Sequence, residues 1–133
     1  MTKEEVRRIS PLILAYEGDA IYELKVRTYL LEQSESNVNT LHRLASRFVS
    51  AAAQSRLMEI LEPVLTEEEL EIYHRGRNAK SHSRPKNAEM IEYRRATGFE
   101  CLFGFLYLSG QMERIDELFE LIAADNLQES LTK

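Results

Sequence analysis

Residues 99–108, FECLFGFLYL, limit the folds open to this chain more than any other stretch. Glu100 is the only charged residue among them, so a helix built from them is hydrophobic on nearly every side. Such a helix must be covered all round, either by the rest of the domain or by a partner subunit. The sequence therefore predicts a helical bundle assembled around this segment.

Helix signals recur along the rest of the chain, and strand signals are almost absent. Ser10 and Pro11 form a cap and first-turn signal for a long helix over residues 11–32. Residues 33–40 are polar and rich in turn formers, which is typical of a connector. Further helices are expected over about 40–61, 66–76, 87–108 and 112–124. The fold class predicted from these signals is all-α.

Caps and helix breakers set the expected ends of the shorter helices. Residues 66–69 have the pattern of a capping box, in which a threonine and a glutamate satisfy each other's backbone donors. A proline stops a helix because it lacks the backbone N–H, and a glycine closes one by adopting a left-handed conformation. The residues taken as boundaries are Asn39 or Thr40, Pro63, Thr66, Gly76 and Asn87.

The chain of 133 residues, 44% of them hydrophobic, is long enough for one domain and short for two. We therefore expect a single domain over residues 1–133. There is neither a charge-free apolar stretch long enough to cross a membrane nor a signal-peptide pattern, so a cytoplasmic protein is expected. Cys101, the single cysteine, lies in the apolar segment and is expected to be a buried side chain.

Two carboxylates stand inside otherwise hydrophobic helices. Gly18 and Asp19 interrupt the helix over residues 11–32, and both are poor residues for a helix interior. Glu100 interrupts the apolar segment 99–108. An ionised carboxylate in such a place needs a cation, a metal or several donors, which suggests that the two acids share one site. The alternative is that each points outward or pairs with an arginine.

Basic residues are concentrated between His74 and Arg95, where seven of them stand against two acidic residues. The net charge of the whole chain is −5, so the charge is unevenly distributed. Residues 76–87 have no helical periodicity and predict an exposed basic loop, which would suit a polyanion such as nucleic acid. The alternative is a solvated loop that binds nothing. The basic residues are Arg75, Arg77, Lys80, Arg84, Lys86, Arg94 and Arg95.

Several stretches resemble the ribonuclease III family. LAYEGDAIYELKVRTYLL resembles the signature helix of that family. LHRLASRFVSAAAQ, HRGRNAKS and PKNAEMIEYRRATGFECLFGFLYLSG are similar to its Mini-ribonuclease III branch, which lacks a separate domain for binding double-stranded RNA. The resemblance covers roughly residues 11–121. It implies an all-helical, homodimeric endonuclease domain that cleaves double-stranded RNA with Mg2+ and leaves 5'-phosphate and 3'-hydroxyl ends.

Carried over to this sequence, the resemblance places the catalytic, metal-binding acids of the family at Asp19 and Glu100. Gly18 would then let another helix or the RNA backbone come close to the site. Ala15 and Thr97 stand where the larger ribonuclease III enzymes carry two more acids, so the number of metal ions per site stays open. The expected RNA contacts are Arg77, Asn78, Lys80, Ser81, Arg84, Lys86, Arg94 and Arg95.

Within the resemblance, the expected substrate is the base-paired stalk of precursor 23S ribosomal RNA, with a ribosomal protein as a possible partner on the precursor. Two other functions stay open. The chain could be a helical RNA-binding or ribosome-associated dimer of the same fold without catalysis, or an interaction protein whose apolar helix serves only for dimerisation. The embedded acids favour the enzyme, because a protein that only binds has no need of them.

Overall fold

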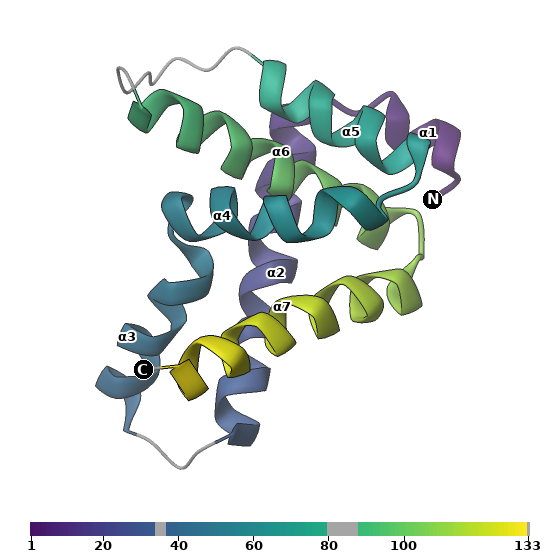
Figure 1. The fold of residues 1–133 in the computed structure, drawn as a ribbon. Helices are drawn as coiled ribbons and strands as arrows, with labels where there is room; N and C mark the ends of the chain where they lie inside the picture. The colour runs from purple at the N-terminus through teal and green to yellow at the C-terminus, as the bar shows by residue number, and fades with distance from the viewer. Residues whose placement is uncertain (34–36, 80–87, 133) are drawn as a thin grey trace.

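The structure is a computed structural model that describes residues 1–33, 37–79 and 88–132. Every regular element in these ranges is a helix, which confirms the all-α prediction (Figure 1). None of these helices combines the length and hydropathy of a membrane-spanning segment. The helices are α1 (Lys3–Arg7), α2 (Pro11–Gln33), α3 (Val38–Val49), α4 (Ala51–Leu61), the 3-10 turn η1 (Glu62–Val64), α5 (Glu67–Asn78), α6 (Ala88–Leu108) and α7 (Met112–Thr132).

Helix α6 is the central element of the bundle. It packs most extensively against α2, α5 and α4, and to a smaller extent against α7 and α1. Residues 101–106 are all buried, whereas Tyr107 is 38% exposed. The predicted burial of the apolar segment on every side is therefore confirmed up to its last turn. Tyr22 of α2 packs edge-on against Phe99 at 4.7 Å between ring centroids, and its hydroxyl donates to the Phe48 carbonyl at 2.9 Å.

Two glycines allow α2 and α6 to cross with their backbones in contact. A Cβ atom on Gly18 would lie 1.7 Å from the Glu100 carbonyl oxygen. A Cβ atom on Gly104 would lie 1.9 Å from the Leu14 carbonyl oxygen. Neither distance is possible for a real side chain, so only glycine fits at either position. Of the two reasons considered for Gly18, the close approach of another helix is the one that the fold shows.

Gly76 does not close α5, contrary to the sequence prediction. The helix continues to Asn78. A Cβ atom on Gly76 would lie 2.6 Å from the Cys101 Cβ and 2.9 Å from the Gly98 Cα. This glycine therefore permits close packing of α5 on α6. Thr66 caps the start of α5 in a capping box with Glu69, as predicted.

The predicted helix over residues 40–61 is wrong, because Ser50 divides it into α3 and α4. The backbone of Ser50 is extended, at φ −66° and ψ 155°, and its side chain accepts a hydrogen bond from the Ala53 N–H at 3.2 Å. A serine can end one helix and cap the next, but no proline or glycine marks the break. The cap of α3 is Asn37 rather than Asn39 or Thr40.

The predicted start of α6 lies outside the described residues, whereas the predicted end of α7 is wrong. Asn87, the predicted cap of α6, lies outside the described residues. Helix α7 runs to Thr132, beyond the predicted end at about residue 124. Cys101 is buried, as expected, and burial raises the pKa of its thiol to about 12, which disfavours the reactive thiolate.

Candidate active site

The crossing of α2 and α6 brings Asp19 and Glu100 together. Gly18 lies against the backbone of Glu100, so the next residue of α2 is carried to the Glu100 side chain. The two carboxyl groups are close enough to share a hydrogen bond, and the charge of Asp19 acts on Glu100. Asp19 is exposed and Glu100 is partly buried. The acids are far apart in the sequence. They meet because Gly18 and Gly104 allow the backbones of α2 and α6 to touch beside them.

The environment of Glu100 favours its protonated form. Burial, followed by the charge of Asp19 and a hydrogen bond with it, raises the pKa of Glu100 to about 8. Two carboxyl groups that share a hydrogen bond in a partly buried site repel each other when both are ionised, so ionisation of the second one is unfavourable. Near neutral pH, in the absence of a cation, the pair therefore holds a proton. A divalent cation could take the place of that proton.

Gln54 of α4 is a third member of the site, and it was not predicted from the sequence. Its side chain is 1% exposed, and its amide Nε2 donates to the Glu100 Oε2 at 3.4 Å. This hydrogen bond opposes the rise in the pKa of Glu100. The available signal was a glutamine that directly follows three alanines in a stretch predicted to be helical. That signal does not name Glu100 as the partner.

Because Ala15 and Thr97 are not acidic, Asp19 and Glu100 are the two acids considered at this site. Ala15 and Thr97 are 6% and 9% exposed, and the Thr97 hydroxyl donates to the Tyr93 carbonyl of its own helix at 3.0 Å. No group of three or more histidine, cysteine, aspartate or glutamate side chains is placed to hold a metal ion within the described part of the chain. Mg2+ needs no such group, because it keeps several waters and is often held by one or two carboxylates together with substrate phosphate. The pair therefore fits this kind of metal site.

Comparison with known proteins agrees with this geometry. Residues 12–111 match the Ribonuclease III domain family. The chain belongs to the ribonuclease III family, in its Mini-ribonuclease III branch. It is 51% identical over 115 residues to the Mini-ribonuclease 3 of Symbiobacterium thermophilum, covering 86% of this chain and 88% of that protein. It is 50% identical over 124 residues to the Mini-ribonuclease 3 of Brevibacillus brevis, covering 90% and 92%.

A solved structure supports the same assignment. The crystal structure of a protein from Fusobacterium nucleatum superposes with a TM-score of 0.80 at 33% identity, covering 92% of this chain and 98% of that one. Membership of the ribonuclease III family makes this chain an endoribonuclease. The Mini-ribonuclease III branch named by the sequence resemblance is therefore confirmed.

The predicted RNA contacts of this ribonuclease III domain are only partly within the described residues. Arg77 lies over the Tyr73 ring at 5.9 Å, and its Nε donates to the Asn78 Oδ1 at 3.3 Å. Arg94 is exposed, whereas Arg95 pairs with Glu59 at 3.6 Å. Arg77 and Asn78 lie in the last turn of α5, and Arg94 and Arg95 lie in the first half of α6. Lys80, Ser81, Arg84 and Lys86 lie outside the described residues.

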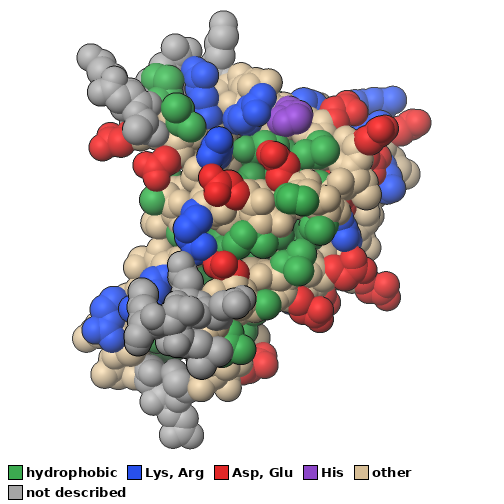
Figure 2. Space-filling model, viewed as in Figure 1, with side chains coloured by type: hydrophobic (Ala, Val, Ile, Leu, Met, Phe, Trp, Pro, Cys, Tyr) green, Lys and Arg blue, Asp and Glu red, His purple; other side chains and the backbone are tan. Residues whose placement is uncertain are grey.

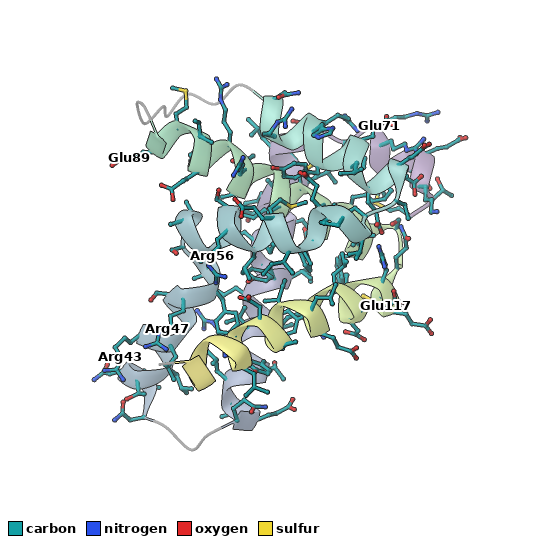
Figure 3. All side chains as sticks on the ribbon, viewed as in Figure 1. Arg43, Arg47, Arg56, Glu71, Glu89 and Glu117 are labelled. Carbon is teal, nitrogen blue, oxygen red and sulfur yellow. The ribbon has the colours of Figure 1, made fainter. Side chains whose placement is uncertain are left out.

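Charge is unevenly distributed over the described surface of the ribonuclease III domain. Figure 2 shows Asp and Glu side chains gathered at the lower right, where Figure 3 labels Glu117 on α7. Lys and Arg side chains lie at the middle and lower left of the same face, where Figure 3 labels Arg56, Arg47 and Arg43, and Asp and Glu side chains lie at the upper left, where Figure 3 labels Glu89. Arg43 and Arg47, which were not among the predicted RNA contacts, are exposed on α3, a helix without acidic residues.

Proposed function

We propose that this endoribonuclease hydrolyses double-stranded RNA with Mg2+ held at Asp19 and Glu100. The convergence of these two acids at the crossing of α2 and α6 is the observation that supports the site. Its second support is membership of a family of endoribonucleases. The same convergence argues against a protein of this fold that only binds RNA, because a pair of acids repels phosphate unless a cation lies between them.

The residues of the chain would divide the work of hydrolysis. A bound Mg2+ ion would supply charge for the scissile phosphate and lower the pKa of the attacking water. Asp19 would offer an exposed oxygen to the ion, while Glu100 would give up the proton that the pair holds near neutral pH. Basic side chains beside the site would hold the RNA backbone. The products would carry 5'-phosphate and 3'-hydroxyl ends.

The outward face of α2 supports the proposed homodimer. Four of its five exposed large apolar side chains recur at helical spacing on the side opposite the buried Leu14, Gly18, Tyr22 and Val26. They are Ile13 at 58% exposed, Tyr16 at 80%, Leu24 at 60% and Leu31 at 65%. A stripe of this kind is costly to leave in water and suits a second copy of the same helix. Two sites related by a two-fold axis could cut both strands of a duplex.

The biological substrate that we propose is a particular RNA duplex. A base-paired stalk of precursor 23S ribosomal RNA suits an enzyme that reads duplex shape, because an A-form helix hides its base edges in a deep, narrow major groove. Cleavage there would take place in the cytoplasm, with a ribosomal protein as a possible partner on the precursor. The support for this substrate is the resemblance to the Mini-ribonuclease III branch.

The experiment is a cleavage assay on a long RNA duplex in Mg2+ or in a chelator. Wild type should cut in Mg2+ only, and Asp19→Asn and Glu100→Gln should each lose at least 100-fold in rate, in line with the removal of a metal ligand. Glu17→Gln is the matched control, since it removes a carboxylate from the same helix outside the acid pair. An intact duplex with wild type in Mg2+, or equal cutting by Asp19→Asn, would overturn the proposal.

A further inference from the structure

We propose that Gln54 is a positioning residue that holds Glu100 ready for the divalent cation. This inference rests on the proposed metal site and adds a third helix to it. Asp19 comes from α2, Glu100 from α6 and Gln54 from α4. Neither the family membership nor the sequence resemblance assigns a role to this glutamine.

The burial of Gln54 calls for an explanation. It is 1% exposed and stands among the apolar neighbours Ala53, Leu57 and Met58, which are 9%, 1% and 2% exposed. A polar amide in such surroundings is unfavourable unless it is hydrogen-bonded. The partner of its Nε2 is the Glu100 Oε2, at 3.4 Å. If packing alone determined the residue at position 54, an apolar side chain would be expected there.

The amide restricts the geometry of the Glu100 carboxyl group. One oxygen of Glu100 faces the Gln54 donor, and the carboxyl group also interacts with Asp19. With one oxygen held from the α4 side, the carboxyl group keeps a fixed orientation and leaves its other lone pairs to a cation between α2 and α6. Outer partners of this kind orient metal ligands, and their loss commonly lowers metal affinity by about 10- to 100-fold.

Helix α4 is anchored so that Gln54 reaches this point. The Gln54 N–H donates to the Ser50 carbonyl at 2.9 Å, in the first turn after the break between α3 and α4. The Ser50 side chain caps the same turn through the Ala53 N–H. Helix α4 also packs directly on α6. The break at Ser50 therefore sets where α4 begins, and Gln54 lies in the first turn of that helix.

The test measures metal binding directly, by titrating Mn2+ into the RNA-free protein and following the heat of binding. Gln54→Met keeps the length of the side chain and suits the apolar surroundings, but it removes the donor. We expect at least a tenfold weaker Mn2+ affinity and an equal rise in the Mg2+ concentration that gives half-maximal cleavage. At saturating Mg2+ the cleavage rate should recover in large part, since Gln54 acts through Glu100.

Two further variants separate positioning from a general effect on folding. Ser55→Ala removes the other buried polar side chain of α4, 6% exposed, and should leave Mn2+ affinity unchanged. Gln54→Asn keeps an amide but withdraws it by one methylene, so it should also weaken Mn2+ binding. It replaces Gln54→Met as the test if Gln54→Met does not fold. Thermal unfolding of each variant shows which of them are folded at the assay temperature.

The outcomes are distinguishable from failure of the proposed function. If wild type binds no Mn2+, or Asp19→Asn binds it equally well, the metal site itself is wrong. If wild type binds and Asp19→Asn does not, while a folded Gln54→Met or Gln54→Asn binds like wild type, only the role of Gln54 is overturned. Equal losses in Gln54→Met and Ser55→Ala would also overturn it, because they would point to disturbed packing of α4.

Discussion

At the scale of single residues, burial beside Asp19 makes the ionisation of Glu100 part of the folding equilibrium. Its pKa is raised from an ordinary 4.5 to about 8, so the folded protein favours the protonated acid. The stabilising effect is complete below the unfolded pKa and is lost as the pH rises through about 8. A divalent cation has the opposite preference, because it binds the ionised form.

We predict that metal-free wild type loses the contribution of Glu100 to stability between about pH 4.5 and pH 8, and that Glu100→Gln loses less over the same interval. The glutamine cannot ionise, so the contribution of this position no longer changes with pH. Urea denaturation in a chelator at several pH values gives the free energies of unfolding. Parallel curves for the two proteins would contradict the assigned ionisation of Glu100.

The two acids could be predicted from the sequence, and Gln54 could not. Asp19 and Glu100 are conspicuous because a charge inside an apolar helix is unfavourable wherever that helix packs. A glutamine is neutral, and it is acceptable in any exposed helix. Its burial depends on how α4 lies on α6, which is a tertiary property. The roles of all three residues stay predictions until the variants are measured.

At the scale of secondary-structure elements, the crossing of α2 and α6 depends on glycine at Gly18 and Gly104. The two helices would have to move apart to admit a side chain at either place, because the atoms in the way are backbone carbonyls. Helix propensity acts in the other direction, since alanine favours a helix over glycine by about 1 kcal/mol. The steric effect should dominate.

Gly18→Ala is therefore predicted to lower the free energy of unfolding by about 2 kcal/mol or more, in the range of overpacked cores. Gly110→Ala is the control. Gly110 has φ 76° with no atom in the way of a Cβ, so this variant should cost about 1 kcal/mol from backbone strain alone. Urea denaturation measures both variants. A smaller loss in Gly18→Ala than in Gly110→Ala would show that the helices can separate cheaply.

Helix boundaries were predictable where a local signal decides them. The long helix from Pro11 and the capping box at Thr66 depend on neighbouring residues, and both were predicted correctly. Gly76 and Ser50 were not predicted correctly. Glycine is common at helix ends, but Gly76 lies inside α5, where it allows close packing against Cys101. Ser50 ends α3 although no proline or glycine is present there. Both depend on tertiary structure that the local sequence does not contain.

At the scale of the whole molecule, the apolar stripe on α2 predicts a dimer in solution. Leu24→Asp should shift the protein towards monomer at micromolar concentration, because a charge would be buried at the centre of the interface. Ile91→Asp is the control, since Ile91 is 57% exposed on α6 and lies off the stripe. Light scattering after size-exclusion chromatography gives the mass. A monomeric wild type, or an unchanged Leu24→Asp dimer, would contradict the proposed interface.

The basic loop expected from the sequence, of which residues 80–87 lie outside the described ranges, predicts a salt-dependent affinity for duplex RNA. Replacing Lys80, Arg84 and Lys86 by alanine should weaken binding and flatten the plot of log affinity against log salt. The slope should fall by about 0.9 or less for each phosphate that the variant no longer neutralises. The control is Lys3→Ala with Arg8→Ala, which removes two positive charges from α1 and its C-cap, beside Glu68 at the opposite end of α5. An unchanged slope in the loop variant would exclude the loop from binding.

The direct contact between the backbones of α2 and α6 has a consequence for how the enzyme fails on heating. No side chain lies between the peptide groups that set the distance between the two backbones, so rotamer changes cannot gradually widen that distance. The backbones that carry Asp19 and Glu100 should keep their relative position until the two helices part, and the helices form the core. Inactivation and loss of helical structure should therefore share one temperature, with no warm, folded and inactive state between them.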